Sequence, residues 1–244
     1  MAQETDLSFI DTFKSKALKG WHIAEYDFSH PHFDTDWRKS QVVFGPAPNK
    51  KQQGVQLKLQ AAPPNHPTEN RFIGGSMRRL KRTHYGSYFA RIKAAQGNGI
   101  VTGFFTYTGP AYQTRHDEID IEILGRKPNH LHVAWFVDGE LKNHFIPLGF
   151  DATQDFHDYQ FIWTPDDIKW FVDGKMVFET FGYQNPIPKV SGFLFANIWA
   201  ADPSIRNWSG TANPRLKSQA QIKKIQFTPF EPNSLKEKLA AAMR

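Results

Sequence analysis

The chain has 244 residues, of which 40% are hydrophobic and 14% aromatic, so it can bury a large core and is not an intrinsically disordered chain. It contains no cysteine, which excludes disulfide bonds and thiolate metal sites. The net charge of +6 is compatible with nucleic acid, a membrane surface or an acidic polymer as partner, but no nucleic-acid-binding signature is present and the apolar runs are too short to span a bilayer.

The first residues, MAQETDLSFIDTF, have neither a basic segment nor a long apolar run, so we expect no signal peptide in this chain. A mature secreted protein preceded by an added Met would begin in the same way. The first strand is predicted at 55–59 (VQLKL). It lies inside a region, 45–67, whose many Pro, Asn, Gln and Lys residues indicate long surface loops.

A dense basic stretch follows, with Arg78, Arg79, Lys81 and Arg82 close together. One interpretation is a solvated sheet face or an edge strand whose charges prevent aggregation. The other is a surface that steers an acidic substrate toward the protein. The pattern is not that of an amphipathic helix, and both interpretations stay open at this point.

Most of the remaining chain is predicted to form short strands, because β-branched and aromatic residues are concentrated between turn signals. The predicted strands span 86–93, 100–107, 116–124, 130–137, 158–163, 168–172, 193–199 and 221–227. Asp138-Gly139 and Asp173-Gly174 are typical of two-residue hairpin turns. One short helix is predicted at 234–243, in the C-terminal tail 231–244, with Ser234 as its N-cap.

Many strands without intervening helices predict an all-β fold, in which two antiparallel sheets pack as a sandwich or jelly roll. No change of composition divides the chain, and no internal repeat is present. Residues 1–244 are therefore predicted to form a single domain.

The segment HDEIDIEILG at 116–125 contains three acids that alternate with three isoleucines. Helical spacing would place Asp120 almost opposite Glu118 and Glu122, whereas strand spacing places all three on one face together with His116. The β-branched isoleucines favour the strand. The acids then line the open face of a sheet, while the isoleucines and Asp117 lie on the other side.

Three like charges in one row repel each other, so their proton affinities must differ, and one carboxyl group can stay protonated while another is ionised. In a strand, the Cα atoms of Glu118 and Glu122 are roughly 13 Å apart, which lets their carboxyl groups approach to roughly 5–6 Å. That separation is typical of a retaining glycosidase rather than an inverting one. The segment therefore indicates a two-carboxylate catalytic site.

A solvated acidic strand and a metal site are the alternatives for this segment. Ca²⁺ ligands usually come from a loop with a tight glycine turn, which is not the pattern here. His130 and His132 share one face of the next predicted strand, but no third ligand is evident, and we interpret them as ordinary polar positions. We therefore expect no metal and no cofactor.

The strand motif EIDIE, followed by Leu124-Gly125, resembles the signature of glycoside hydrolase family 16. The similarity covers about residues 70–228 and includes YGSY (85–88), GFFTYTGP (103–110), LGFDA (148–152), FHDY (156–159), IKWFVDG (168–174) and NIW (197–199). It is closest to the branch of bacterial 1,3-1,4-β-glucanases (lichenases) and exopolysaccharide glycanases. The resemblance implies a concanavalin-like β-jelly roll, and a secreted or periplasmic, monomeric enzyme that cleaves a polysaccharide with retention of configuration.

By position, Glu118 resembles the nucleophile of this family, Glu122 the general acid/base and Asp120 the helper that hydrogen-bonds Glu118. The candidates for substrate binding are Arg78, Tyr107, His116, Asn197, Trp199 and Trp208. The tryptophans can stack on sugar rings or belong to the core, and polar side chains can hydrogen-bond sugar hydroxyls.

The chain departs from the lichenase pattern in three places. His116 stands where lichenases carry Trp, and Ser76-Met77 stand where they carry Glu and an aromatic residue, so cereal β-glucan specificity is not implied. Lys223 stands where the family has an Asp that holds a structural calcium, which also argues against a metal. The net positive charge favours an anionic polysaccharide as substrate.

Two other functions stay open. A transglycosylase on the same scaffold is favoured by His116, because plant xyloglucan endotransglycosylases carry His at this position. A non-catalytic, lectin-like carbohydrate-binding domain would share the fold, but it has no need of two carboxyl groups at this spacing.

Overall fold

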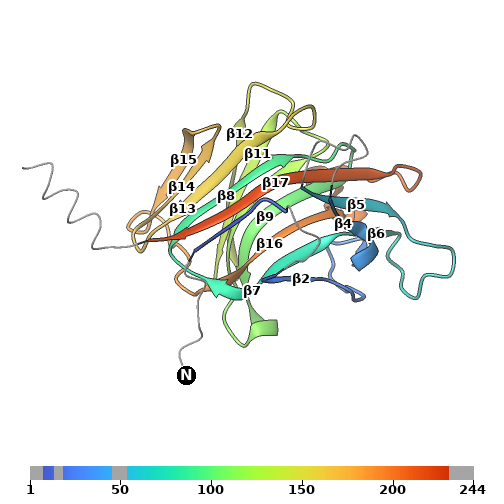
Figure 1. The fold of residues 1–244 in the computed structure, drawn as a ribbon, viewed down its shortest axis with the longest axis horizontal. Coiled ribbons are helices and arrows are strands. Elements are labelled where there is room, and N and C mark those ends of the chain that lie inside the picture. Colours follow the sequence, from blue (N-terminus) through green and yellow to red (C-terminus); the bar gives the residue numbers. More distant parts are fainter. Residues whose placement is uncertain (1–7, 14–18, 46–53, 231–244) are drawn as a thin grey trace, which may run out of the picture.

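The computed structural model describes residues 8–13, 19–45 and 54–230, which fold almost entirely into β-strands (Figure 1). The strands are β1 Phe9–Asp11, β2 Trp21–Ile23, β3 Thr35–Trp37, β4 Val42–Phe44, β5 Val55–Ala61, β6 Phe72–Gly74, β7 Ser76–Thr83, β8 Gly86–Lys93, β9 Ile100–Thr108, β10 Asp117–Leu124, β11 His130–Val137, β12 Glu140–Pro147, β13 His157–Trp163, β14 Asp167–Val172, β15 Lys175–Phe181, β16 Gly192–Ala200 and β17 Ser218–Pro229. The helical turns are η1 Lys39–Gln41, η2 Pro110–Tyr112, η3 Pro203–Ile205 and α1 Arg206–Ser209. None of the helices in the described ranges has the length and hydropathy that crossing a membrane requires.

The strands form two sheets. One has ten strands, in the order β15-β14-β13-β8-β17-β5-β6-β3, with β1 beside β17 and β4 beside β5. The other has seven, in the order β12-β11-β10-β9-β16-β7-β2. Pairing is antiparallel except between β3 and β6, as far as the described strands go. The predicted all-β sandwich is confirmed.

The acid-bearing strand β10 is anchored to the core between the sheets. Ile119, Ile121 and Ile123 are fully buried there, and burial of each such side chain stabilises the fold by roughly 1.5–3 kcal/mol. The indole Nε1 of Trp170, in the opposite sheet, donates a hydrogen bond to the carbonyl oxygen of Asp120 at 3.1 Å. Both effects hold the strand in the register that turns its acids outward.

Every predicted strand is present, with ends that differ by at most three residues. Both predicted hairpin turns are also confirmed. Asp138 and Gly139 have φ values of 52° and 84°, and Asp173 and Gly174 have 47° and 77°. Positive φ at both central residues is what a type I′ turn requires. The predicted helix at 234–243 lies outside the described residues.

Several strands escaped prediction because their sequences do not alternate between apolar and polar residues. β12 is almost wholly exposed at one edge of its sheet, and β15 lies at an edge of the other. The short strands β1 to β4 and β6 are too brief to show a period. Strand pairing, rather than local pattern, defines these elements.

The basic stretch lies in β7, between β16 and β2, so its interpretation as a solvated sheet face or an edge strand is wrong for Arg79 and Arg82. Arg79 and Arg82 are only 9% and 4% exposed. The guanidinium of Arg82 donates to Oγ1 of Thr108 at 2.8 Å and to the carbonyl oxygen of Ser191 at 2.6 Å. These hydrogen bonds compensate the cost of burying the charge. Half of the cluster is therefore structural.

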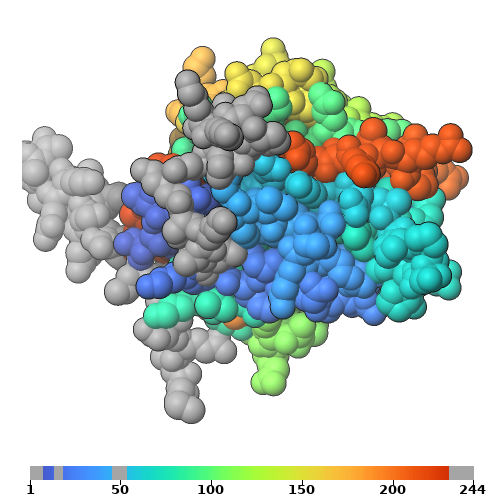
Figure 2. Space-filling model, turned by 45° about the vertical axis from the view of Figure 1, so that its right-hand side comes forward, coloured from blue at the N-terminus to red at the C-terminus, as the bar shows by residue number. Residues whose placement is uncertain are grey.

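The connection between β9 and β10 contains η2 and projects from the body of the molecule (Figures 1 and 2). It brings Tyr112 beside Phe193 of β16, with ring centroids 4.7 Å apart. This loop therefore forms one border of the face on which the acids lie.

Candidate active site

The register of the seven-stranded sheet gathers the acids and their neighbours on one open face. Residues directly opposite each other in antiparallel strands point to the same side. Rows of opposed residues cross β11, β10, β9 and β16: Phe136, Glu118, Tyr107 and Phe193; Ala134, Asp120, Phe105 and Phe195; His132, Glu122, Gly103 and Asn197. The predicted sharing of one face by Glu118, Asp120 and Glu122 is confirmed.

Glu118 is held by a histidine that was predicted to contact substrate. Nε2 of His116 lies 2.6 Å from Oε2 of Glu118, and the imidazole packs edge-on against Tyr107 and stacks on Phe136. Burial raises the pKa of Glu118, whereas the hydrogen bond and charge of His116 lower it. His116 thus favours the ionised form of Glu118 and opposes the effect of burial.

Asp120 lies between the two glutamates, and its surroundings favour its protonated form. Burial raises its pKa well above the ordinary value, and the negative charges of Glu118 and Glu122 raise it further. The Asp120 carboxyl group in turn lowers the pKa of Glu118, while its buried Oδ2 has no hydrogen-bond partner in the described structure. Burial and the neighbouring carboxylates thus raise the pKa of Asp120 well above its ordinary value. The spread of proton affinities along β10 stays a prediction.

The raised pKa of Asp120 leads to a prediction about stability. Above the ordinary pKa of 3.8, Asp120 ionises in the unfolded chain but keeps its proton in the fold, so its contribution to stability falls as pH rises toward the folded pKa. The slope is about 1.4 kcal/mol per pH unit. Asp120→Asn removes this penalty. Its melting temperature relative to wild type should therefore be higher at pH 7 than at pH 5, measured by differential scanning calorimetry.

The exposed Asp155 provides the matched control. Asp155→Asn should show the same difference from wild type at both pH values. If Asp120→Asn behaves in the same pH-independent way, Asp120 is not protonated in the folded protein.

Glu122 has its own histidine, His132, at a position that the sequence predicts to be ordinary and polar. Nδ1 of His132 lies 2.9 Å from Oε2 of Glu122. The ring is 4% exposed, and packs against Phe145 and Trp208 with centroids 4.6 and 5.4 Å away. No hydrogen-bond partner in the described structure reaches its Nε2. This interpretation of His132 is corrected: it touches a central acid. His130 has no such role here, and pairs with Asn129.

The polar substrate-binding candidates lie around the same face. Tyr107 is the neighbour of Glu118 in β9, and Asn197 occupies the row of Glu122 with a buried, unpaired Oδ1. Arg78 lies in the row of Asp120, across Phe195. Its guanidinium sits over the ring of Phe193 at 4.6 Å. Their contacts with a sugar stay predictions, which these positions support.

The two tryptophans lie together at the Glu122 end of this face. Trp199 is only 5% exposed, because Phe33 stacks on it at 4.1 Å and Trp208 lies 5.9 Å away. Trp199 therefore packs in a small second core in this structure, and does not offer a free ring face. Trp208 is half-buried, next to His132. It is the better placed of the two for stacking on a sugar.

Phe33 also lies at the Glu122 end of the acid face, and the sequence did not predict it there. The segment around it pairs with the end of β16: Asp34 N–H donates to the carbonyl oxygen of Ala200 at 3.0 Å, and Asp202 N–H to that of His32 at 2.8 Å. No local pattern links residues as far apart in the chain as Asp34 and Ala200. Only the pairing of strand ends brings Phe33 to the site.

Lys223, which stands where the family has a calcium-binding Asp, contacts an aromatic ring in this structure. Nζ of Lys223, in β17, lies 3.9 Å from the centroid of the Phe156 ring. Within the described ranges, no cluster of three or more His, Asp and Glu side chains could hold a metal ion. The absence of a bound metal stays a prediction.

Comparisons with known proteins converge on one group. Residues 29–223 match the family described as "Glycosyl hydrolases family 16". The chain is 33% identical to the endo-1,3-1,4-beta-glycanase ExoK of Rhizobium meliloti over 91% of this chain and 78% of that protein. It is 34% identical to a beta-glucanase of Bacillus subtilis over 92% of this chain and 88% of that protein.

A solved structure agrees with these sequence matches. The beta-glucanase of Bacillus licheniformis superposes with a TM-score of 0.83, at 30% identity, over 93% of this chain and 100% of that chain. The two-sheet architecture is therefore shared over most of the chain, well beyond the acid motif.

Proposed function

The chain belongs to family 16 of the glycosyl hydrolases, and from this premise we propose that it is a retaining endo-β-glycanase acting on a β-1,3-1,4-type glucan. It is thus a glycoside hydrolase with a jelly-roll fold. One observation carries the proposal: Glu118 and Glu122 share an open face of β10, each with its own histidine, and Asp120, whose pKa is raised by burial, lies between them.

In the proposed first step, the carboxylate of Glu118 attacks the anomeric carbon. The glycosidic C–O bond breaks, and the leaving oxygen takes a proton from Glu122. The hydrogen bond of His116 supports this assignment, because it favours the ionised form of Glu118.

In the second step, Glu122 removes a proton from water, whose oxygen attacks the anomeric carbon of the glycosyl-enzyme. The ester bond breaks, Glu118 returns as a carboxylate and Glu122 is protonated again. Two inversions leave the β-configuration unchanged. His132 helps to orient the Glu122 carboxyl group through its hydrogen bond.

The test of this function combines product analysis with stereochemistry. Purified protein should release oligosaccharides from a mixed-linkage β-glucan, and ¹H NMR of the early time course should show the β-anomer first. An α-anomer as first product would rule out the retaining mechanism. If no β-glucan or bacterial exopolysaccharide in a panel is cleaved, the hydrolase proposal fails as a whole.

An anionic exopolysaccharide with a β-glucan backbone is the finer proposal for the substrate. The net charge of +6 supports it, although the burial of Arg79 and Arg82 leaves Arg78 and Lys81 as the accessible part of the basic cluster. Salt shortens the Debye length from about 30 Å at 0.01 M to about 8 Å at 0.15 M. Added NaCl should therefore lower kcat/KM on an acidic polymer and hardly change it on neutral β-glucan. Equal responses would remove the argument for steering.

We also propose that the protein works as a monomer outside the cytoplasm. A polysaccharide of high molecular mass does not cross a membrane unaided. An enzyme that cleaves its internal glycosidic bonds must therefore meet it outside the cytoplasm. Size-exclusion chromatography with light scattering tests the monomer: a mass near the 28.0 kDa of the chain is expected.

A further inference from the structure

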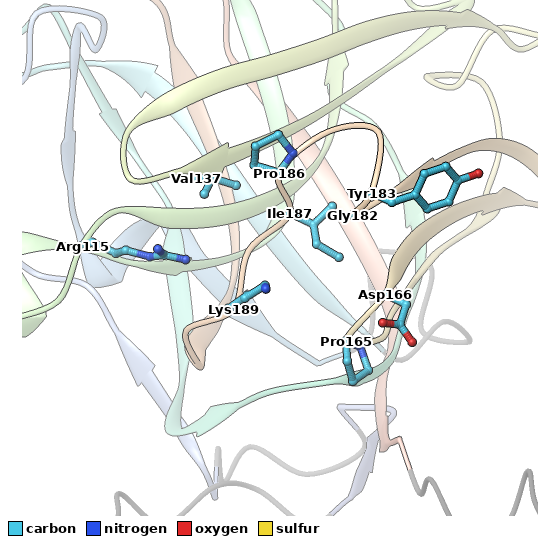
Figure 3. A pocket seen from close by; sticks show the side chains of 9 residues that line it. All are labelled: Arg115, Val137, Pro165, Asp166, Gly182, Tyr183, Pro186, Ile187 and Lys189. Atoms are coloured by element: carbon cyan, nitrogen blue, oxygen red, sulfur yellow. The ribbon is translucent and has the colours of Figure 1, made fainter.

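A cavity of about 580 Å³ lies at the edge of the sandwich (Figure 3). It is bounded by the connection between β15 and β16, the turn between β13 and β14, Arg115 just before β10 and Val137 at the end of β11. Val137 pairs with Asp117, whose side chain points away from Glu118. The cavity therefore lies behind the acid face. Its volume is within the range of roughly 300–1,000 Å³ that small-molecule sites occupy.

The cavity is lined by both apolar and charged side chains. In Figure 3, Arg115 and Lys189 lie on one side, Asp166 and Tyr183 on the other, and Ile187 lies between them. Tyr183 is 81% exposed, although it is a large aromatic side chain. Its ring stacks on Phe181, with centroids 5.4 Å apart and planes 28° apart, which fixes a projecting platform beside the cavity.

One buried carboxylate holds the walls of this cavity together. Oδ2 of Asp117 accepts hydrogen bonds from the backbone N–H of Lys189 at 2.8 Å, the backbone N–H of Val190 at 3.1 Å and Nη2 of Arg115 at 2.9 Å. Oδ1 accepts from the N–H of Asp138 at 3.2 Å. The cavity is thus preformed, which lowers the entropic cost of binding. Asp117 also directly precedes Glu118, so the cavity is built onto the start of the acid strand.

We propose that this cavity is an accessory binding site for a saccharide segment of the polysaccharide that the acids cleave; the inference rests on the proposed function. An exposed ring and apolar floor match the C–H faces of a pyranose, and charged groups of both signs match its hydroxyl groups. Asp166 disfavours a phosphate ligand, which the two cations alone would attract. A second point of attachment raises the local concentration of polymer at the acids.

The experiment compares a long and a short substrate. Tyr183→Ala should lower the ratio of kcat/KM on soluble β-glucan to kcat/KM on a β-glucan tetrasaccharide by about threefold to tenfold, because only the polymer can occupy both sites at once. Met176→Ala is the matched control, since Met176 is a 51% exposed apolar residue of the neighbouring hairpin that does not line the cavity. It should keep the wild-type ratio.

Binding without cleavage gives a second readout. In a Glu118→Gln background, affinity electrophoresis through gels that contain soluble β-glucan should show weaker retardation when Tyr183→Ala or Lys189→Ala is added. Unchanged retardation together with an unchanged kcat/KM ratio would overturn the accessory site while wild-type hydrolysis continues. If the wild-type protein cleaves neither a β-glucan nor a bacterial exopolysaccharide, the proposed function itself fails, and the accessory site fails with it.

Discussion

Replacement of Glu118 by Ala is expected to abolish turnover on every substrate, with a loss of about 10⁴-fold or more in kcat. The side chain would supply the only protein atom that bonds to the anomeric carbon, and even a good leaving group does not remove the need for this nucleophile. The loss should therefore be as complete on activated aryl β-glycosides as on polysaccharide. Initial rates on both substrate types, with purified and folded variants, provide the measurement.

Addition of azide to the Glu118→Ala variant tests the assignment of Glu118 as nucleophile more directly. In Glu118→Ala, the small anion can enter the space left by the carboxyl group and attack an activated β-glycoside once, which yields an α-glycosyl azide. Glu140→Ala, an exposed acid of β12, is the matched control and should keep wild-type activity. Polysaccharide hydrolysis near the wild-type rate by Glu118→Ala would sink the nucleophile assignment.

Glu122→Ala is expected to behave differently, because a general acid matters only when the leaving group needs a proton. Activity on polysaccharide should fall by about 10²–10⁴-fold. Activity on aryl β-glycosides with acidic phenol leaving groups should fall much less in the first step. The contrast between the two substrates, expressed as a ratio of kcat/KM values, is the decisive quantity.

Here azide should give the opposite stereochemistry. Glu118 still forms the glycosyl-enzyme in Glu122→Ala, and azide then displaces it, so the product is a β-glycosyl azide. An α-azide from this variant, or equal losses on both substrate types, would contradict the role of Glu122. Comparison of the two variants thus separates the nucleophile from the acid/base without reference to any relative.

The strand that carries the acids could be predicted from the sequence because one local rule decides it. Side chains alternate across a strand, and alternating acids and isoleucines at 118–123 have only one amphipathic solution there. The buried isoleucines then turn Glu118, Asp120 and Glu122 to the same open face. Hairpin turns such as Asp138-Gly139 follow for a similar reason, since few residue pairs tolerate positive φ at both positions.

The partners of those acids depended on contacts between distant segments. His132 is an unremarkable polar residue in its own strand, and becomes the neighbour of Glu122 only through the register of β11 against β10. Phe33 reaches Trp199 through pairing of residues far apart in the chain, which turns a predicted sugar platform into a packed ring. Neither contact leaves a periodic signal that a single sequence could reveal.

The charged side chains show the same contrast between what the sequence determines and what the tertiary structure decides. The sequence determined that the protein is basic and that Arg78, Arg79, Lys81 and Arg82 lie close together. Tertiary structure decided which charges water can reach, because Thr108 and Ser191 supply hydrogen-bond acceptors that make a buried Arg82 tolerable. Local alternation determines which face of a strand a residue lies on, whereas burial, pairing and proton affinity depend on what the rest of the chain packs against that face.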